Sequence, residues 1–236
     1  MVIKQMKDDI GQFFDHFRKV SAHFRERLTP DVHSPANHEL LAGKMACCAL
    51  LDALSVARFP NRTHGERFRA FVGKFSKYEY WDRVSIPQLL FKLQHSSSSD
   101  DECLRKHAEM YLARRQGYAI KDDPRCPELT GRFPGSKKMI DDCCYLSLFY
   151  SYRCALVHEM RAPGYGYEFE YDERPCYRTQ TEIPTQRRSF QLTYPLRFFF
   201  NVCDECIINL EQYFLDENRS PFDAYDPRFG DVWHRS

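Results

Sequence analysis

The sequence predicts a mainly α-helical protein with a small β-hairpin before its last helix. Apolar residues recur at three- and four-residue steps over most of the chain, a spacing that places them on one face of a helix. The stretch 165–171 instead alternates aromatic and charged residues with a period of two, as strands do. Proline and glycine separate these stretches, so we expect a bundle of helices joined by loops.

The first half of the chain predicts five helices. Phe13, Phe17 and Phe24 lie on one face of the first, and Pro30 follows it. Asn37 is a residue type that caps helix N-termini, and Asp100 or Asp101 can do the same for the fifth helix. The predicted spans are 4–28, 37–59, 65–75, 86–94 and 100–113.

The second half predicts an irregular crossing, a buried helix, a hairpin and a last helix. Prolines and few apolar residues mark residues 117–136 as the crossing. The next helix, 137–160, is apolar on most sides, as expected in a core or an interface. Aromatic and charged residues alternate over 165–171, so this segment should pair with 188–193 in a hairpin spanning 165–193. With a last helix over 196–215, we expect a single domain over 4–215 and a polar tail over 216–236.

The composition excludes several classes of protein. The chain has 236 residues with 43% hydrophobic residues, enough for a core, which excludes disordered and fibrous classes. Its net charge of +1 provides no general attraction to polyanions. Arg outnumbers Lys by 23 to 11, and Arg is suited to planar contacts with phosphate. Any contact with a polyanion should therefore be local.

Ten cysteines suggest disulfides at first, but that interpretation belongs to short secreted chains. The N-terminal segment 1–19 has no apolar signal region. The longest nearly apolar run, 45–57, contains Asp52 and is shorter than the roughly 20 residues that span a bilayer. We therefore expect a soluble, cytoplasmic protein with reduced thiols and no membrane partner.

The cysteines also raise the question of a metal site. Cys203 and Cys206 form a possible half-site, which Cys143 and Cys144, or Cys176, could complete. No second CxxC is present, and free cysteine is commonly a small core hydrophobe, so we expect no metal and no cofactor. The sequence also lacks a phosphate-binding Gly-rich loop, HExxH and GxSxG motifs.

Arg153 and His158 stand out on the predicted buried helix. Burying an arginine and a histidine costs free energy unless they have partners or face a cleft. Positions five apart on a helix are about 140° apart around its axis and about 7.5 Å apart along it, so one helix does not easily direct both at a single atom. Two copies of the helix across a two-fold axis could join both pairs in one polar cleft.

The string RCALVHE, residues 153–159, resembles the Arg-x4-His motif of the HEPN superfamily. The resemblance includes the order of elements, with ALLDALSV at 49–56 and GERFRAFVGKF at 65–75 before the motif helix, and it covers about 4–215. It implies a metal-independent endoribonuclease that acts as a homodimer in bacterial defence or a toxin–antitoxin system, with RNA as substrate and an antitoxin or regulatory protein as partner. The residue after the motif Arg is often polar in that family, and here it is Cys154.

The chemistry of RNA cleavage suits the two motif residues. His158 can act as general base or acid near neutral pH. Arg153 stays charged and can bind the phosphate and stabilise the charge of the transition state. The alternative is that both are ordinary residues, with Arg153 paired to Asp141, Asp142 or another carboxylate and His158 at the helix end, where a cation is favoured.

Supporting roles are expected for six further residues. Asp52 could orient Arg153, or mark the solvated side of its helix. Arg67, Arg69 and Lys74 are expected on one side of their helix, contacting RNA phosphates or forming a solvated face. Tyr150 and Glu159 could reach the cleft, although packing and capping explain them equally well. The rival functions are a catalytically silent HEPN-like module that binds RNA, nucleotide or a protein partner, and a plain helical scaffold.

Overall fold

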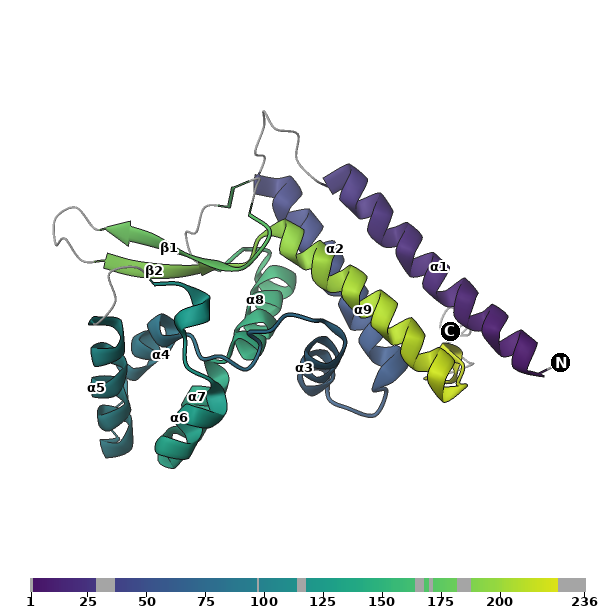
Figure 1. The fold of residues 1–236 in the computed structure, drawn as a ribbon. Coiled ribbons are helices and arrows are strands. Elements are labelled where there is room, and N and C mark those ends of the chain that lie inside the picture. Colours follow the sequence, from purple (N-terminus) through teal and green to yellow (C-terminus); the bar gives the residue numbers. More distant parts are fainter. Residues whose placement is uncertain are drawn as a thin grey trace, which may run out of the picture. The chain divides into compact units, whose positions relative to one another are not determined.

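The computed structural model describes residues 2–28, 37–96, 98–113, 118–163, 168–169, 172–181 and 188–224. These residues are mainly helical, with one two-stranded antiparallel sheet, which confirms the predicted fold class (Figure 1). The chain forms two compact units, unit 1 from Met1–Lys77 and Phe199–Ser236, and unit 2 from Tyr78–Phe198. The single domain over 4–215 stays a prediction.

Unit 1 contains long helices whose apolar faces form a shared core. They are α1 (Val2–Leu28), α2 (Asn37–Arg58), α3 (His64–Phe75) and most of α9 (Leu196–Glu217), followed by the 3₁₀ turn η3 (Pro221–Ala224). Helices α1, α2 and α9 run alongside one another in Figure 1. Phe14, Leu51 and Phe199 are fully buried, as the three- and four-residue spacing of apolar positions requires.

Polar contacts join α1 to α9 at the edge of this core. The Asp204 carboxylate accepts hydrogen bonds from the Ser21 hydroxyl at 3.2 Å and the Arg25 guanidinium at 2.5 Å. Arg18 pairs with Glu211, about two turns after Asp204 on α9. These contacts hold α1 and α9 together.

The apolar composition of α2 bears on the expectation that the protein is soluble. By length and composition alone, His38–Arg58 could cross a membrane, and it is the one such helix among the described residues. However, half of its most apolar window is buried inside the protein, with Cys48, Leu51 and Leu54 fully buried. This burial is typical of the core helix of a soluble protein.

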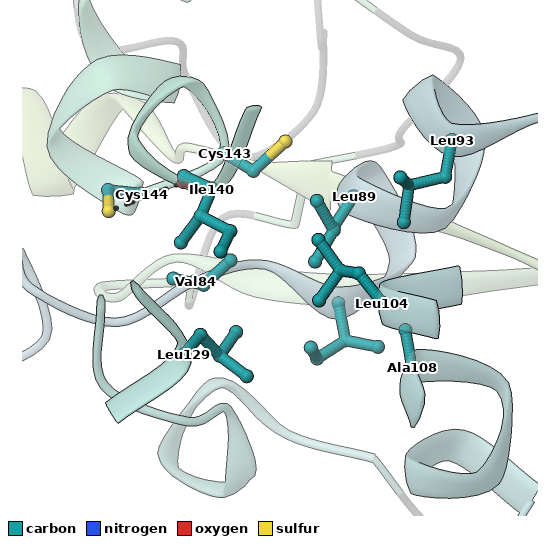
Figure 2. Close-up of a cluster of buried hydrophobic side chains, with 10 residues drawn as sticks. Val84, Leu89, Leu93, Leu104, Ala108, Leu129, Ile140, Cys143 and Cys144 are labelled. Carbon is teal, nitrogen blue, oxygen red and sulfur yellow. Dashed lines mark hydrogen bonds between the residues drawn. The ribbon is translucent and has the colours of Figure 1, made fainter. Parts of the chain in front are cut away.

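Unit 2 surrounds a second apolar cluster, drawn in Figure 2. Its helices include α4 (Ile86–Leu93), α5 (Ser99–Ala113), α6 (Cys126–Arg132), α7 (Lys137–Asp142) and α8 (Tyr145–Glu159), with 3₁₀ turns η1 (Ile120–Asp122) and η2 (Pro134–Ser136). The buried cluster consists of Val84, Ile86, Leu89, Leu93, Leu104, Ala108, Leu129, Ile140, Cys143 and Cys144. It draws one to three side chains from each helix from α4 to α7, which fixes these short helices.

The predicted helix 137–160 is wrong as a single helix, because the chain breaks it into α7 and α8. Cys144 between them is extended, with φ −64° and ψ 143°. The Ser85 amide donates to the Cys143 carbonyl at 3.0 Å, and the Tyr145 amide donates to the Arg83 carbonyl at 2.9 Å. These hydrogen bonds to the distant segment 83–85 replace the hydrogen bonds of a continuous helix. The sequence has no proline or glycine at the break.

The predicted irregular crossing at 117–136 contains more regular structure than expected. The turn η1, helix α6 and turn η2 occupy most of its described part. Pro127 stands in the first turn of α6, where a missing backbone N–H has no helical partner to lose. The prolines therefore mark helix starts as well as breaks.

The predicted hairpin has the right second strand and a different first strand. Strand β1 (Cys176–Thr181) pairs antiparallel with β2 (Arg188–Thr193), placing Cys176 opposite Thr193. Most of 165–171 lies outside the described residues, and Glu168 and Phe169, which are described, are not strand. The start of the predicted tail also changes, since α9 extends to Glu217 and η3 follows it. Residues 225–236 lie outside the described residues.

Candidate active site

Helix α8 places Arg153 on its buried face and His158 at its exposed end. Phe149, Tyr152 and Leu156 share the buried face at helical spacing. Arg153 is only 6% exposed among them, whereas His158 in the last turn is exposed. Arg153 is therefore a buried charge, and only His158 of the two faces water.

The two side chains meet within one chain. Arg153 Nη1 lies 3.3 Å from His158 Nε2. Because a guanidinium only donates hydrogen bonds, Nε2 must accept, so the ring proton is on Nδ1 in this arrangement. The expectation that one helix does not easily bring both to one point is therefore wrong, since the long arginine side chain spans the offset along the helix.

The helix end around His158 is tightly defined. Met160 adopts a left-handed conformation with φ 51°, and its amide donates to the Ala155 carbonyl. Glu159 accepts from Arg161 Nε at 2.5 Å, and both side chains are more than half exposed. Glu159 therefore pairs with Arg161 just beyond the end of α8, and its supporting role in the cleft stays a prediction.

The carboxylates proposed as alternative partners of Arg153 have partners of their own. Asp141 pairs with Lys137, and Asp142 lies 3.7 Å from Lys92. Tyr150 is half-buried one turn before Arg153 on α8. The contact with His158 is one described contact of the Arg153 guanidinium.

The remaining predicted residues belong to unit 1. Asp52 is half-buried on α2, with Oδ1 at 3.1 Å from His64 Nε2 at the start of α3. Its proposed role in orienting Arg153 stays a prediction. His64 is a partner that the sequence did not suggest, because it follows Asp52 only after a loop.

The three basic residues of α3 do not share one side of the helix. Arg67 and Arg69 are two positions apart and so lie about 200° apart around the axis. Arg67 Nε donates to the buried Ser55 hydroxyl of α2 at 3.2 Å. The Lys74 ammonium lies 5.2 Å from the centre of the Tyr213 ring of α9. An RNA-binding role for these residues stays a prediction.

Sequence reasoning missed a buried carboxylate in unit 2. Asp123 is fully buried, and its two oxygens accept hydrogen bonds from the Tyr118, Tyr145 and Tyr177 hydroxyls and the Ile86 amide. Burial raises the pKa of Asp123 to about 6, and the hydrogen bonds from Tyr118 and Tyr145 oppose that rise. The three tyrosines lie on different elements, so no local pattern reveals the network.

The Asp123 network predicts a distinctive dependence of stability on pH. Its pKa rises from 3.8 in the unfolded chain to about 6 in the folded protein, so the folded state holds its proton over a range in which the unfolded state has lost it. The contribution of Asp123 to stability therefore falls by about 2 kcal/mol as pH rises from 4 to 7. We expect Asp123→Asn to lose this component when unfolding by urea is measured across that range.

The exposed carboxylate variant Asp15→Asn on α1 is the control for the pH experiment. It should keep the pH dependence of the wild-type protein. If Asp123→Asn and Asp15→Asn showed the same profile, the assignment of the pH-dependent component to Asp123 would be wrong.

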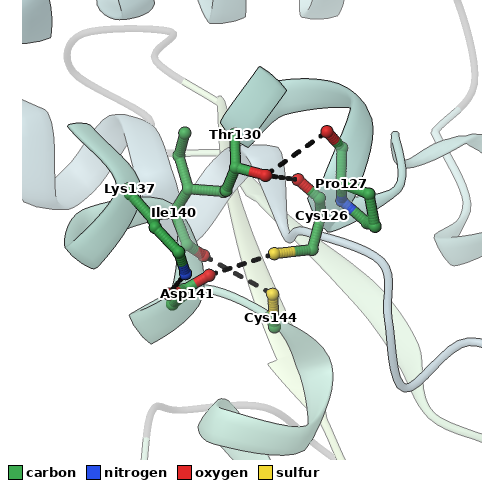
Figure 3. A network of polar contacts seen from close by, with 7 residues as sticks. All are labelled: Cys126, Pro127, Thr130, Lys137, Ile140, Asp141 and Cys144. Carbon is green, nitrogen blue, oxygen red and sulfur yellow. Dashed lines mark hydrogen bonds and ion pairs between the residues drawn. The ribbon is translucent and has the colours of Figure 1, made fainter. Parts of the chain in front are cut away.

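A second group missed by the sequence is a cluster of two thiols and a carboxylate, drawn in Figure 3. The donor atoms of Cys126, Asp141 and Cys144 all lie within 4.8 Å of one another. It is the one group of at least three metal-ligating side chains found among the described residues. The sequence suggests Cys143 and Cys144 as candidate metal ligands. Their neighbour Cys126 lies 18 residues before Cys144 in the chain.

The cysteine half-site suggested by the sequence has a different setting. Cys203 and Cys206 are buried on α9 in unit 1, and Cys203 Sγ donates to the Cys47 carbonyl at 3.6 Å. Burial raises the pKa of both thiols well above the usual range. Their environment is that of small core residues.

Comparison with known proteins gives no match for this chain. No family model, no curated protein and no solved structure matches it. Function must therefore be argued from the residues and their geometry.

Proposed function

We propose that the chain is a HEPN-type, metal-independent endoribonuclease. The observation that carries this proposal is the 3.3 Å contact between Arg153 Nη1 and His158 Nε2 at the end of α8. A permanent cation and a titratable imidazole are two of the groups that RNA cleavage requires, and here they adjoin one another. The proposal includes RNA as substrate, a cytoplasmic homodimer and a role in bacterial defence or toxin–antitoxin regulation with a protein partner.

The proposed reaction is an attack of the RNA 2′-hydroxyl on the adjacent phosphorus. His158 Nε2 exchanges its hydrogen bond with Arg153 for one with the 2′-hydroxyl and takes up its proton. The new 2′-O–P bond forms as the P–O5′ bond breaks, which gives a 2′,3′-cyclic phosphate. A protonated His158 from the second copy supplies the proton to the leaving 5′-oxygen, and Arg153 stabilises the charge on the phosphoryl oxygens.

The burial of Arg153 favours one alternative, a catalytically silent module of the same type. Because Arg153 is only 6% exposed and already bonded to His158, a phosphate must displace that bond to reach it. Such a module would bind RNA, nucleotide or a protein partner without cleaving RNA. Cys154 in place of the polar residue frequent in the family points the same way.

The test is cleavage of single-stranded RNA by the purified chain. We expect products with 5′-hydroxyl ends, which a polynucleotide kinase labels without prior phosphatase treatment. His158→Ala should reduce the cleavage rate by roughly 10²–10⁴-fold, since it removes the proton-transfer group. EDTA should leave the rate unchanged at a temperature where circular dichroism shows the protein folded.

The matched control is His95→Ala, an exposed histidine just after α4, which should cleave like the wild-type protein. RNA binding without cleavage by the wild-type protein would replace the nuclease with the silent module. Cleavage that survived His158→Ala, or that EDTA abolished while the protein stayed folded, would refute the proposed mechanism.

A further inference from the structure

We propose that Cys126, Asp141 and Cys144 form a zinc site that joins the starts of α6 and α8 to α7. This inference goes beyond the proposed ribonuclease activity and does not rest on it. Cys126 is the first residue of α6, Asp141 lies near the end of α7, and Cys144 is the N-cap of α8. Thiolate and carboxylate donors of this kind bind Zn²⁺ in proteins.

The spacing of the donor atoms fits a tetrahedral ion. Zn–S distances of about 2.3 Å and Zn–O distances of about 2.1 Å at the tetrahedral angle put donor atoms about 3.6–3.8 Å apart. Cys126 Sγ lies 3.3 Å from Asp141 Oδ1, and no donor pair in the group exceeds 4.8 Å. Shifts of a few tenths of an ångström to about one ångström would therefore accommodate the ion.

The backbone holds the two cysteines in place independently of their side chains. A segment at 82–85 forms bridges with residues on both sides, Arg83 with Arg125 and Val84 with Cys144. The Cys126 amide donates to the Asp82 carbonyl at 2.6 Å, and the Val84 amide donates to the Pro124 carbonyl at 2.9 Å. These bonds, with those at the α7–α8 break, bring two cysteines distant in sequence to one point.

Neighbouring groups orient the donor atoms and balance their negative charge. The Lys137 ammonium pairs with Asp141 Oδ2, which leaves Oδ1 directed at Cys126 (Figure 3). Cys144 Sγ lies 3.6 Å from the Ile140 carbonyl. Two thiolates and one carboxylate carry three negative charges, which a divalent ion and the Lys137 ammonium together balance.

The site is open enough for an ion to enter and for water to complete its coordination. The Asp141 side chain is 42% exposed, while Cys144 is 8% exposed. Three protein ligands leave the fourth tetrahedral position to a water molecule. Bound zinc would link α6, α7 and α8, so it should stabilise unit 2 against unfolding.

The experiment is a titration of the chelator-treated full chain with ZnCl₂, and with CoCl₂ as a spectroscopic probe. We expect one ion per chain, thiolate-to-cobalt charge-transfer absorption and a rise in Tm with zinc. Cys126→Ala and Cys144→Ala should lose stoichiometric binding. Asp141→Asn should lower the affinity for zinc by more than the roughly 10–100-fold that removal of an outer-shell partner costs. Cys103→Ala, which removes an exposed thiol of α5, should bind like the wild-type protein.

A measurement on the wild-type protein covers the case in which a variant fails to fold. Zinc should slow alkylation of the partly exposed Cys126, read by mass spectrometry, and leave Cys103 unaffected. Absence of stoichiometric binding, binding retained in both cysteine variants, or a Cys126–Cys144 disulfide in place of zinc would overturn the inference. RNA cleavage is measured separately, so failure of either proposal is distinguishable from failure of the other.

Discussion

Arg153→Lys is expected to reduce RNA cleavage by roughly 10²–10³-fold while the protein stays folded. Lysine keeps the charge but loses the planar, two-pronged donation by which a guanidinium binds phosphoryl oxygens. Loss of one such electrostatic donor typically costs this factor in kcat. Lysine also cannot reproduce the Nη1 contact with His158 in the same geometry, so the imidazole loses its neighbour at 3.3 Å.

The measurement is the single-turnover cleavage rate, with circular dichroism as the check on folding. Arg125→Lys is the matched control, because Arg125 is an exposed arginine of the same unit, paired with Asp82 at 3.4 Å. It should cleave at the wild-type rate. Equal rates for Arg153→Lys and Arg125→Lys would mean that Arg153 has no role in the reaction.

Phe149→Ala is expected to cost about 3–5 kcal/mol of the free energy of unfolding. Phe149 is fully buried on α8. Its ring centre lies 5.2 Å from that of Tyr194, 5.3 Å from that of Trp81 and 5.9 Å from that of Phe198. Truncation leaves a cavity among large rings that cannot collapse without losing contacts with one another.

Urea denaturation followed by circular dichroism measures this loss. Phe91→Ala makes the same chemical change on α4, where the side chain is 63% exposed, and should change stability by less than about 0.5 kcal/mol. A cost below about 1 kcal/mol for Phe149→Ala would show that the aromatic cluster does not stabilise unit 2 as described.

The two residues of the Arg-x4-His motif in the candidate site could be identified from the sequence. Both residues were found because they share one local string on one predicted helix. Their contact was not predicted, since an ideal helix separates the two positions and the long arginine side chain joins them. The pairing of Asp52 with His64 was missed for a related reason, because a loop of unknown course separates the two residues.

What the sequence alone determined is the helical class and most helix positions. Periodic apolar residues specify a buried face within a few turns, and prolines end or begin helices locally, so α1–α4 and α9 match their predictions within two residues at each end. Strand β2 was also predicted, as the pairing partner of 165–171.

Tertiary structure alone decided the break between α7 and α8, the identity of β1, the Asp123 network and the Cys126–Asp141–Cys144 cluster. Each depends on residues far apart in the chain, joined by backbone pairing with segment 82–85, by cross-strand bonds or by burial. Local spacing carries no information about such partners, because a hydrogen bond from a distant amide can replace a helical one at little net cost in free energy.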